Sequence, residues 1–206
     1  MDNELVIRFA DVDDINTIGF LAQQIWPAAY GDILRQEQIS YMLNLFYSPD
    51  ALMDQMKRLK HSFVLAELEE EPVGFASLGA LDKNGLYKLH KLYILPGKQG
   101  KGLGKALLDF IIEEIKIRHA DAAGAAQDTG GPVPGTTGAA PGTASQVSDT
   151  AGAAPGKPIL LRLGVNRFNP ALNFYERLGF AKIKEEKTDI GNGFVMDDYI
   201  MELKIS

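Results

Sequence analysis

The 206-residue sequence contains no cysteine, and this absence excludes disulfide bonds, thiolate metal sites and a cysteine nucleophile. Histidine is also scarce. His61, His90 and His119 stand far apart in the sequence, so no zinc cluster and no other metal site is expected. No apolar run approaches the ~18 residues that a membrane span needs, and the first residues are acidic where a secretory signal would be basic. We therefore expect a cytoplasmic protein with no membrane partner.

The acidic balance of the chain argues against nucleic acid as its main partner. Lysine and arginine number 21 against 27 aspartates and glutamates, which gives a formal net charge of −6. Binding to nucleic acid depends on cationic side chains that neutralise phosphates. Because 46% of the residues are hydrophobic, the chain has enough apolar surface for one substantial core.

One segment, residues 120–157, differs in composition from the rest of the chain. Most of its residues are Ala, Gly, Pro, Thr or Ser, and none is aromatic. Such a segment buries too little apolar surface to offset the entropy of ordering its backbone, so we predict a flexible insert. The blocks 1–119 and 158–206 are then expected to pack together, which makes residues 1–206 a single interrupted domain.

The rest of the chain alternates between strand-like and helix-like patterns. Short apolar or alternating runs predict strands at 5–9, 61–67, 73–81, 86–95, 159–165, 180–188 and 194–204. Apolar residues at helical spacing predict one helix that begins near Asp11 or Asp13 and ends at Pro27. The same spacing predicts further helices at 37–47, 50–59, 103–118 and 170–178. The fold class is therefore mixed α/β.

The most informative segment is a glycine loop between the strand at 86–95 and the helix at 103–118. Gln99, Gly102 and Gly104 form the pattern Q-x-x-G-x-G there. A helix N-terminus presents about four unpaired N–H groups and a partial positive charge, and glycine lets the backbone approach an anion closely. The junction is a candidate pyrophosphate cradle, with a plain glycine loop and solvated lysines as the simpler alternative. Its spacing matches neither the dinucleotide motif G-x-G-x-x-G nor the P-loop.

This loop and a later motif resemble the GCN5-related N-acetyltransferase (GNAT) superfamily. The loop region reads P-G-K-Q-G-K-G-L-G-K-A-L-L over residues 96–108, and residues 169–180 read N-P-A-L-N-F-Y-E-R-L-G-F. The resemblance covers essentially the whole chain apart from the insert. It implies the GNAT fold, a mixed, mostly antiparallel twisted sheet of about six or seven strands, flanked by helices. Two neighbouring strands of that sheet splay apart to hold acyl-CoA.

The resemblance also implies a site for the co-substrate acetyl-CoA and no metal. The loop amides would hold the pyrophosphate, and the end of the preceding strand would offer backbone groups to the pantetheine arm. These positions are Leu92, Tyr93, Ile94, Gln99, Gly100, Lys101, Gly102, Leu103, Gly104 and Lys105. Many members carry a cofactor-binding Asn where this chain has Phe168. We include the neighbouring Asn169 as a cofactor contact, although capping of the helix that begins at Pro170 explains it equally well.

Two residues are candidate catalytic groups. Tyr175 falls at the family's tyrosine, whose phenol often protonates the departing thiolate, and packing of its helix on the sheet is the alternative. On an ideal strand, His90 shares a face with Leu92 and Ile94 and would look into the gap between the splayed strands. The ordinary pKa of histidine suits a general base. A structural histidine, with water carrying the proton away, is the alternative.

The activity that the resemblance implies is transfer of acetyl from acetyl-CoA to a primary amine by direct attack. Trp26, Tyr30 and Tyr41 are candidate acceptor-side residues, with ordinary core packing as the alternative. Asp197 and Asp198 would suit a polyamine, and the ending M-D-D-Y-I-M-E is similar to bacterial spermidine/spermine-type acetyltransferases. A protein N-terminus or another small amine stays open as the acceptor. A homodimer is compatible with the family, and a catalytically weak acyl-CoA sensor is the alternative function.

Overall fold

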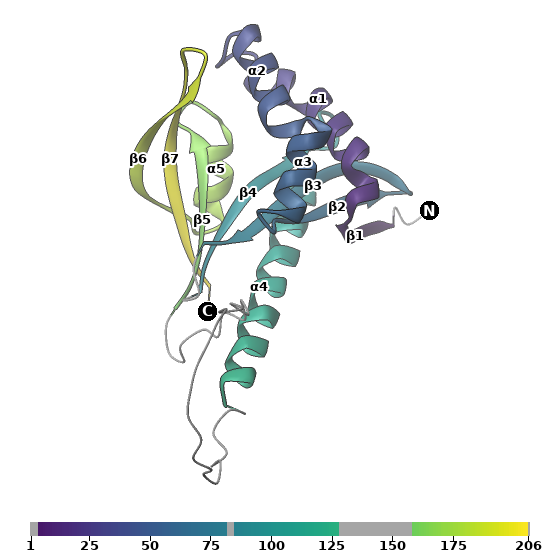
Figure 1. Ribbon diagram of the computed structural model, residues 1–206, viewed down its shortest axis with the longest axis vertical. Coiled ribbons are helices and arrows are strands. Elements are labelled where there is room, and N and C mark those ends of the chain that lie inside the picture. Colours follow the sequence, from purple (N-terminus) through teal and green to yellow (C-terminus); the bar gives the residue numbers. More distant parts are fainter. Residues whose placement is uncertain (1–3, 82–84, 128–157, 206) are drawn as a thin grey trace, which may run out of the picture.

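The computed structural model describes residues 4–81, 85–127 and 158–205. These residues form one seven-stranded sheet with helices on both faces (Figure 1). The strands are β1 (Leu5–Ala10), β2 (Ser62–Leu68), β3 (Glu71–Ala80), β4 (Leu86–Ile94), β5 (Ile159–Asn166), β6 (Ala181–Gly191) and β7 (Phe194–Ile205). The helices are the short 3-10 helix η1 (Val12–Asp14), α1 (Ile15–Tyr30), α2 (Gln36–Tyr47), α3 (Pro49–Lys57), α4 (Leu103–Gln127) and α5 (Ala171–Arg177). The predicted mixed α/β fold class is confirmed.

The sheet breaks open between its two central strands. The strand order is β1-β2-β3-β4-β5-β7-β6, and every neighbouring pair is antiparallel except β4 with β5. This parallel pair is bonded only over the first half of each strand, from Leu86 opposite Leu160 to Leu89 opposite Leu163. Beyond that point the two strands diverge, as the teal β4 and the green β5 do in Figure 1. The predicted splayed strand pair is therefore present.

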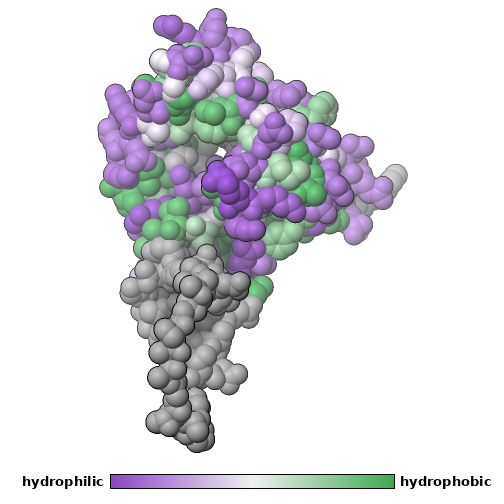
Figure 2. Space-filling model, in the orientation of Figure 1, coloured by the Kyte–Doolittle hydropathy of each residue, from purple (hydrophilic) through white to green (hydrophobic). Residues whose placement is uncertain are grey.

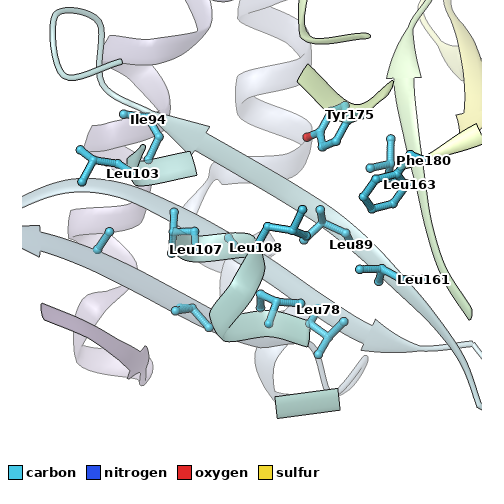
Figure 3. Close-up of a cluster of buried hydrophobic side chains, with 14 of the residues drawn as sticks. Leu78, Leu89, Ile94, Leu103, Leu107, Leu108, Leu161, Leu163, Tyr175 and Phe180 are labelled. Atoms are coloured by element: carbon cyan, nitrogen blue, oxygen red, sulfur yellow. The ribbon is translucent and has the colours of Figure 1, made fainter. Parts of the chain in front are cut away.

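Each face of the sheet has its own hydrophobic core. One core joins α4 and α5 to the sheet, and Figure 3 shows Leu107 and Leu108 of α4 packed near Leu78 and Leu89 of the strands. The other core joins α1, α2 and α3 to the opposite face and contains the buried Trp26. Helical layers thus hold the sheet on both sides of the place where β4 and β5 separate.

The prediction that Pro27 ends the first long helix is wrong, because α1 continues to Tyr30. A proline inside a helix lacks one N–H donor and crowds the preceding turn, but Pro27 lies in the last turn, where little helix remains to be disturbed. Its carbonyl oxygen still accepts the N–H of Gly31 at 3.0 Å. Ile25 and Trp26, at most 3% exposed, hold this turn against the sheet. Packing therefore outweighs the local cost of the proline.

The helix after the glycine loop is also longer than predicted. Composition predicts an insert from residue 120 onward, whereas α4 continues to Gln127. Residues 120–127 read A-D-A-A-G-A-A-Q, and alanine has the highest helix propensity of all residues. An alanine-rich stretch that continues a formed helix needs no new nucleus. The rest of the predicted insert, residues 128–157, lies outside the described residues.

Candidate active site

A cleft of about 640 Å³ occupies the place where β4 and β5 separate. Its walls come from β4, from the glycine loop with the start of α4, from β5, and from α5 with the residues just before it. The end of α1 closes one side. Figure 2, in the orientation of Figure 1, shows the surface hollowed between the N-terminal helices and the region of β5 and α5. The break in the sheet is therefore a binding cleft that solvent reaches.

The glycine loop leaves a row of backbone N–H groups unpaired. Within the described part of the chain, the N–H groups of residues 99–105 have no hydrogen-bond acceptor. Gly100 and Gly102 have φ angles of 76° and 79°, which only glycine adopts readily, and a Cβ at either position would meet nothing within 4 Å. The Gln99 side chain ties the loop to β4, because its Nε2 donates to the Ile94 carbonyl oxygen at 3.2 Å. Unpaired N–H groups at a helix N-terminus form a site for an anion such as pyrophosphate.

Nearly all of the predicted cofactor-binding residues line this cleft. They are Leu92, Tyr93, Ile94, Gln99, Gly100, Gly102, Leu103, Gly104, Lys105 and Asn169. Lys101 is the exception, because its side chain is exposed and lies outside the lining of the cleft. Lys105 lines the cleft, but its ammonium group also pairs with Asp109 at 2.6 Å on the surface of α4. The sequence thus located the cleft, and the binding of a cofactor by these residues stays a prediction.

For Tyr175 and Asn169 the sequence left two alternatives open, a place in the site and a structural role. In the structure, each residue lines the cleft and also has the structural contact. The Tyr175 ring packs against Phe174 and Phe180 with centroids 5.2 and 5.6 Å apart, and the side chain also lines the cleft. In Figure 3 its hydroxyl points away from Phe180. Burial raises the pKa of Tyr175 above its ordinary value, so the phenol keeps its proton at neutral pH. Asn169 Oδ1 accepts the N–H of Ala171 at 2.8 Å, at the start of α5, and Asn169 lines the cleft as well.

A β-bulge in β4 interrupts the alternation of its side chains between the two faces of the sheet. Ser77 of β3 pairs with Lys91, but the next residue, Leu78, pairs with Leu89, so β4 contains one extra residue, His90. Strict alternation along β4 is lost at this point. His90 and Lys91 line the cleft together with their neighbours Leu89 and residues 92–94.

The prediction that His90 shares a face with Leu92 and Ile94 is wrong because of this bulge. Leu92 and Ile94 pack in the core beneath α4, whereas His90 stacks on His61 with ring centroids 3.9 Å apart. Gly79 makes room for the pair, since a Cβ there would lie 2.8 Å from His90 Nε2. Burial lowers the pKa of His90 to about 3 and that of His61 to about 4. Both rings are therefore neutral near pH 7.

A second cavity, of about 420 Å³, adjoins the cleft on the side of the sheet that α1, α2 and α3 cover. Aromatic and apolar side chains form much of its wall, among them Trp26, Leu34, Met42, Leu45, Phe46 and Tyr47. The residues that line both spaces are Tyr30, His90, Lys91, Tyr93 and Gly164. Two molecules bound in the two spaces would therefore meet at the break in the sheet.

The two acidic residues that the sequence places together on the last strand have different surroundings. Asp198 lines the second cavity and lies opposite Asn166 of β5. Burial, together with the nearby charge of Asp197, raises the pKa of Asp198 to about 6. The Asp197 carboxylate instead lies 3.5 Å from the cationic groups of both Arg167 and Lys187. Of the two acids, Asp198 is the one placed to exchange a proton with a bound molecule.

Of the three aromatic residues predicted on the acceptor side, two line the second cavity and one does not. Trp26 and Tyr30 line the second cavity, whereas Tyr41 does not. The Tyr41 hydroxyl donates to the Ile190 carbonyl oxygen at 2.6 Å, and its ring packs on Phe194 with centroids 5.4 Å apart. Tyr41 therefore fastens the hairpin of β6 and β7 to α2, and the packing alternative holds for this residue.

Two further properties concern the described residues alone. Within 4–81, 85–127 and 158–205, no helix has both the length and the apolar character that crossing a bilayer requires. Across the same ranges, no three His, Asp or Glu side chains are grouped so that they would hold a metal ion.

A family model described as the acetyltransferase (GNAT) domain matches residues 60–182, which is more than half of the chain. The chain belongs to the GNAT acetyltransferase family. The matched region runs from the start of β2 to the start of β6. It therefore contains the glycine loop, the two strands that separate and α5.

Three individual proteins are similar to this chain, one in sequence and two solved structures in fold. An uncharacterized N-acetyltransferase of Methanocaldococcus jannaschii is 31% identical over 68 residues, which cover 31% of this GNAT chain and 30% of the relative. The match thus spans less than a third of that relative's length. The PaiA N-acetyltransferase of Thermoplasma acidophilum, solved in complex with coenzyme A, superposes with a TM-score of 0.67 at 23% identity, over 98% of this chain and 99% of that one. A GCN5-related N-acetyltransferase of Rhodopseudomonas palustris gives 0.68 at 16% identity, over 99% and 98%.

Two residues that the GNAT fold brings to the second cavity were not identified from the sequence. They are Gln55 on α3 and Lys91 on β4, whose side chains are hydrogen-bonded although 36 residues separate them in the chain. No motif marks either residue. Strict alternation would also place Lys91 on the opposite face from His90, and the bulge that overrides it depends on pairing with β3.

Proposed function

We propose that this GNAT chain is an N-acetyltransferase that transfers the acetyl group of acetyl-CoA directly to a primary amine. The observation that carries the proposal is the meeting of two spaces at the break between β4 and β5. One space is bordered by a loop with unpaired N–H groups, and the other is a separate cavity that shares lining residues with the first. Two reactants held in adjoining sites gain much of their rate advantage from proximity and orientation.

The cleft has the groups that acetyl-CoA needs. The unpaired N–H groups of residues 99–105 suit its pyrophosphate. The edge of β4 beyond Leu89 has no β5 partner. Backbone groups of residues 92–94 that are bonded neither to β3 nor, in the case of the Ile94 carbonyl oxygen, to Gln99 are therefore available to the pantetheine arm. The related PaiA enzyme was solved with coenzyme A, which supports the same use of the fold here. When bound, acetyl-CoA supplies an activated acetyl carbonyl at the break in the sheet.

In the proposed step, the amine nitrogen bonds to the acetyl carbon, the carbon–sulfur bond breaks, and the coenzyme A sulfur takes a proton. Tyr175 is the candidate donor of that proton, because its side chain lines the cleft. Since burial raises its pKa, the phenol is protonated at neutral pH and is able to donate a hydrogen bond to the sulfur as it departs. The products are the N-acetylated amine and coenzyme A.

Two side chains compete for the role of general base toward the attacking amine. His90, the base predicted from the sequence, lines both spaces and is neutral. Its pKa of about 3 makes it a weak base, better suited to passing a proton on than to holding one. Asp198, with a pKa of about 6, is closer to the value that favours general-base catalysis near neutral pH.

Calorimetric titration of acetyl-CoA tests the cofactor assignment. We expect micromolar binding to the wild type and its loss in Gly102→Glu, because a carboxylate would enter the loop at a φ of 79°. Gly193→Glu is the matched control. Gly193 has a φ of 76°, nothing lies within 4 Å of an added Cβ, and the residue lies outside the lining of the cleft. Equal binding by both variants, or no binding by the wild type, would refute the assignment.

Thiol release with a panel of amines then tests the activity. Turnover with one class of amine supports the enzyme and identifies the kind of acceptor. Tight binding of acetyl-CoA without turnover on any amine would favour the alternative of an acyl-CoA sensor.

A further inference from the structure

Lys91 is a buried cation that has no anion beside it. The residue is 9% exposed and lines the second cavity. Its Nζ donates a 2.5 Å hydrogen bond to Gln55 Oε1 and lies 5.3 and 5.4 Å from the ring centroids of Tyr47 and Phe63. Among the described residues, no carboxylate forms an ion pair with it. A buried charge is costly unless an opposite charge or a full set of hydrogen bonds accompanies it.

Gln55 fixes the orientation of this ammonium group without satisfying it. The Gln55 Nε2 donates to the carbonyl oxygens of Phe46 at 2.8 Å and of Ala51 at 3.0 Å. Because both amide hydrogens are used, the Oε1 atom is held toward Lys91. An ammonium group has three hydrogens to donate, so two are left for a molecule bound in the second cavity.

The other charged groups around the second cavity do not supply the missing anion. Lys88 adds a second cation, and its charge also acts on Lys91. Asp54 is already paired with Arg58 at 2.6 Å. Asp198 lines the cavity but makes no ion pair with Lys91. In the described lining, two lysines are therefore opposed by a single carboxylate that is not engaged elsewhere.

We propose that the acceptor carries a carboxylate as well as its amine, as a free amino acid with an apolar side chain does. This inference rests on the proposed function and names its substrate class. The carboxylate pairs with Lys91, the apolar side chain lies against Trp26 and the neighbouring apolar wall, and the amine is acetylated at the break in the sheet. A polyamine fits less well, because Lys88 and Lys91 repel additional cations.

Matched pairs of probes test this inference by equilibrium binding. The chain has a single tryptophan, Trp26, which lines the second cavity, so its fluorescence reports on occupancy. The probes are L-phenylalanine and L-leucine, their carboxamides, and spermidine, each titrated in the presence of coenzyme A. In the wild type we expect each amino acid to bind at least tenfold more tightly than its carboxamide, and spermidine to bind weakly.

Lys91→Met should bring the ratio of amino acid to carboxamide affinity close to one. Methionine keeps the unbranched length of the side chain and removes the buried charge, so the variant is expected to fold, and thermal unfolding without ligand checks this. Lys116→Met is the control, because Lys116 lies on α4, outside the lining of both spaces, and pairs with Glu113 at 3.1 Å. This control should keep the wild-type ratio.

Several results would overturn the inference. Equal binding of the amino acids and their carboxamides by the wild type would overturn it and would instead favour a peptide N-terminus, which the carboxamides mimic. Tighter binding of spermidine, or no binding of either amino acid, would overturn it as well. Titration of acetyl-CoA on the same preparation distinguishes failure of the proposed function from failure of the acceptor class. If acetyl-CoA binds and an amine without a carboxylate is acetylated, the proposed function stands and only the acceptor class is wrong.

Discussion

The imidazole rings of His61 and His90 stack with their centroids 3.9 Å apart and their planes 22° from parallel. His90 comes from the bulge of β4, and Gly79 of β3 leaves the space in which the two rings meet. Burial is the main reason why the pKa of each ring is low, and the charges of Lys88 and Lys91 lower both values further. The pair is thus an uncharged contact beside the candidate site.

Replacement of His61 by phenylalanine should reduce the sensitivity of the fold to acid. The folded pKa of His61, about 4, lies below the value of 6.5 that we take for the unfolded chain. The unfolded state therefore binds more protons as pH falls below 6.5, and stability is lost in that range. Between pH 6.5 and 4.5 we expect His61→Phe to lose about 1 kcal/mol less stability than the wild type, after allowance for screening at a half-exposed ring.

Urea unfolding at several pH values measures this effect. His119→Phe is the control, because it removes a histidine outside the stacked pair. Parallel pH profiles for the wild type and His61→Phe would contradict the prediction.

Asp198→Asn should stabilise the protein at neutral pH. The folded pKa of Asp198, about 6, lies above its ordinary value of 3.8. The folded state therefore binds more protons between pH 3.8 and 6, and the cost of ionising this buried group is fully present above pH 6. Asparagine removes that cost, so we expect a gain of about 1 kcal/mol at pH 7.5 and none at pH 3. Asp109→Asn on the exposed face of α4 is the control, and a gain of the same size there would argue against burial as the cause.

The pH dependence of kcat/KM distinguishes the two candidate bases. If Asp198 accepts the proton, log kcat/KM should rise by one unit per pH unit up to about pH 6 and then level off. In Asp198→Asn this inflection should disappear and the rate should fall by about 100-fold or more. If His90 is the base, the profile should be flat between pH 5 and 7.5, and His90→Gln should carry the loss instead.

Tyr175→Phe should lower kcat by about 10- to 100-fold while the affinity for acetyl-CoA is kept. Phenylalanine preserves the packing against Phe174 and Phe180, so stability should change little. Tyr41→Phe is the converse control. It removes a hydrogen bond to Ile190 and should cost about 1 kcal/mol of stability without changing kcat. Unchanged turnover in Tyr175→Phe would contradict the catalytic role and show that Tyr175 contributes packing only.

Replacement of residues 128–157 by a short Gly/Ser linker should leave the affinity for acetyl-CoA unchanged. The described walls of the cleft come from α1, β4, the glycine loop, β5 and the α5 region, and the linker would start after the end of α4 at Gln127. Calorimetry on the shortened chain measures the effect. A tenfold loss of affinity would show that the segment contributes to the site.

Much of the candidate cleft was predictable because its motifs determine their own local structure. The glycines between residues 99 and 104 lie between a strand pattern and an apolar helix pattern, so a loop is expected there. The motif at 169–180 indicates a helix that ends near a glycine. Two predictions failed where packing or propensity outweighed a local signal. Burial of Trp26 carried α1 past Pro27, and alanine continued α4 beyond Arg118.

The α/β class, the strand, loop and helix at its centre, and most residues of the cleft could be predicted from the sequence, because they depend on short-range pattern and backbone chemistry. The presence of Gln55 and Lys91 in the second cavity, beside the predicted Trp26, Tyr30 and Asp198, follows only from the tertiary structure. One extra residue in β4 relative to β3 places His90 and Lys91 there, and the packing of α3 brings Gln55 to Lys91. Strand register and helix packing are set by partners distant in the chain, so the pattern of one strand cannot reveal a bulge or a contact between residues 55 and 91.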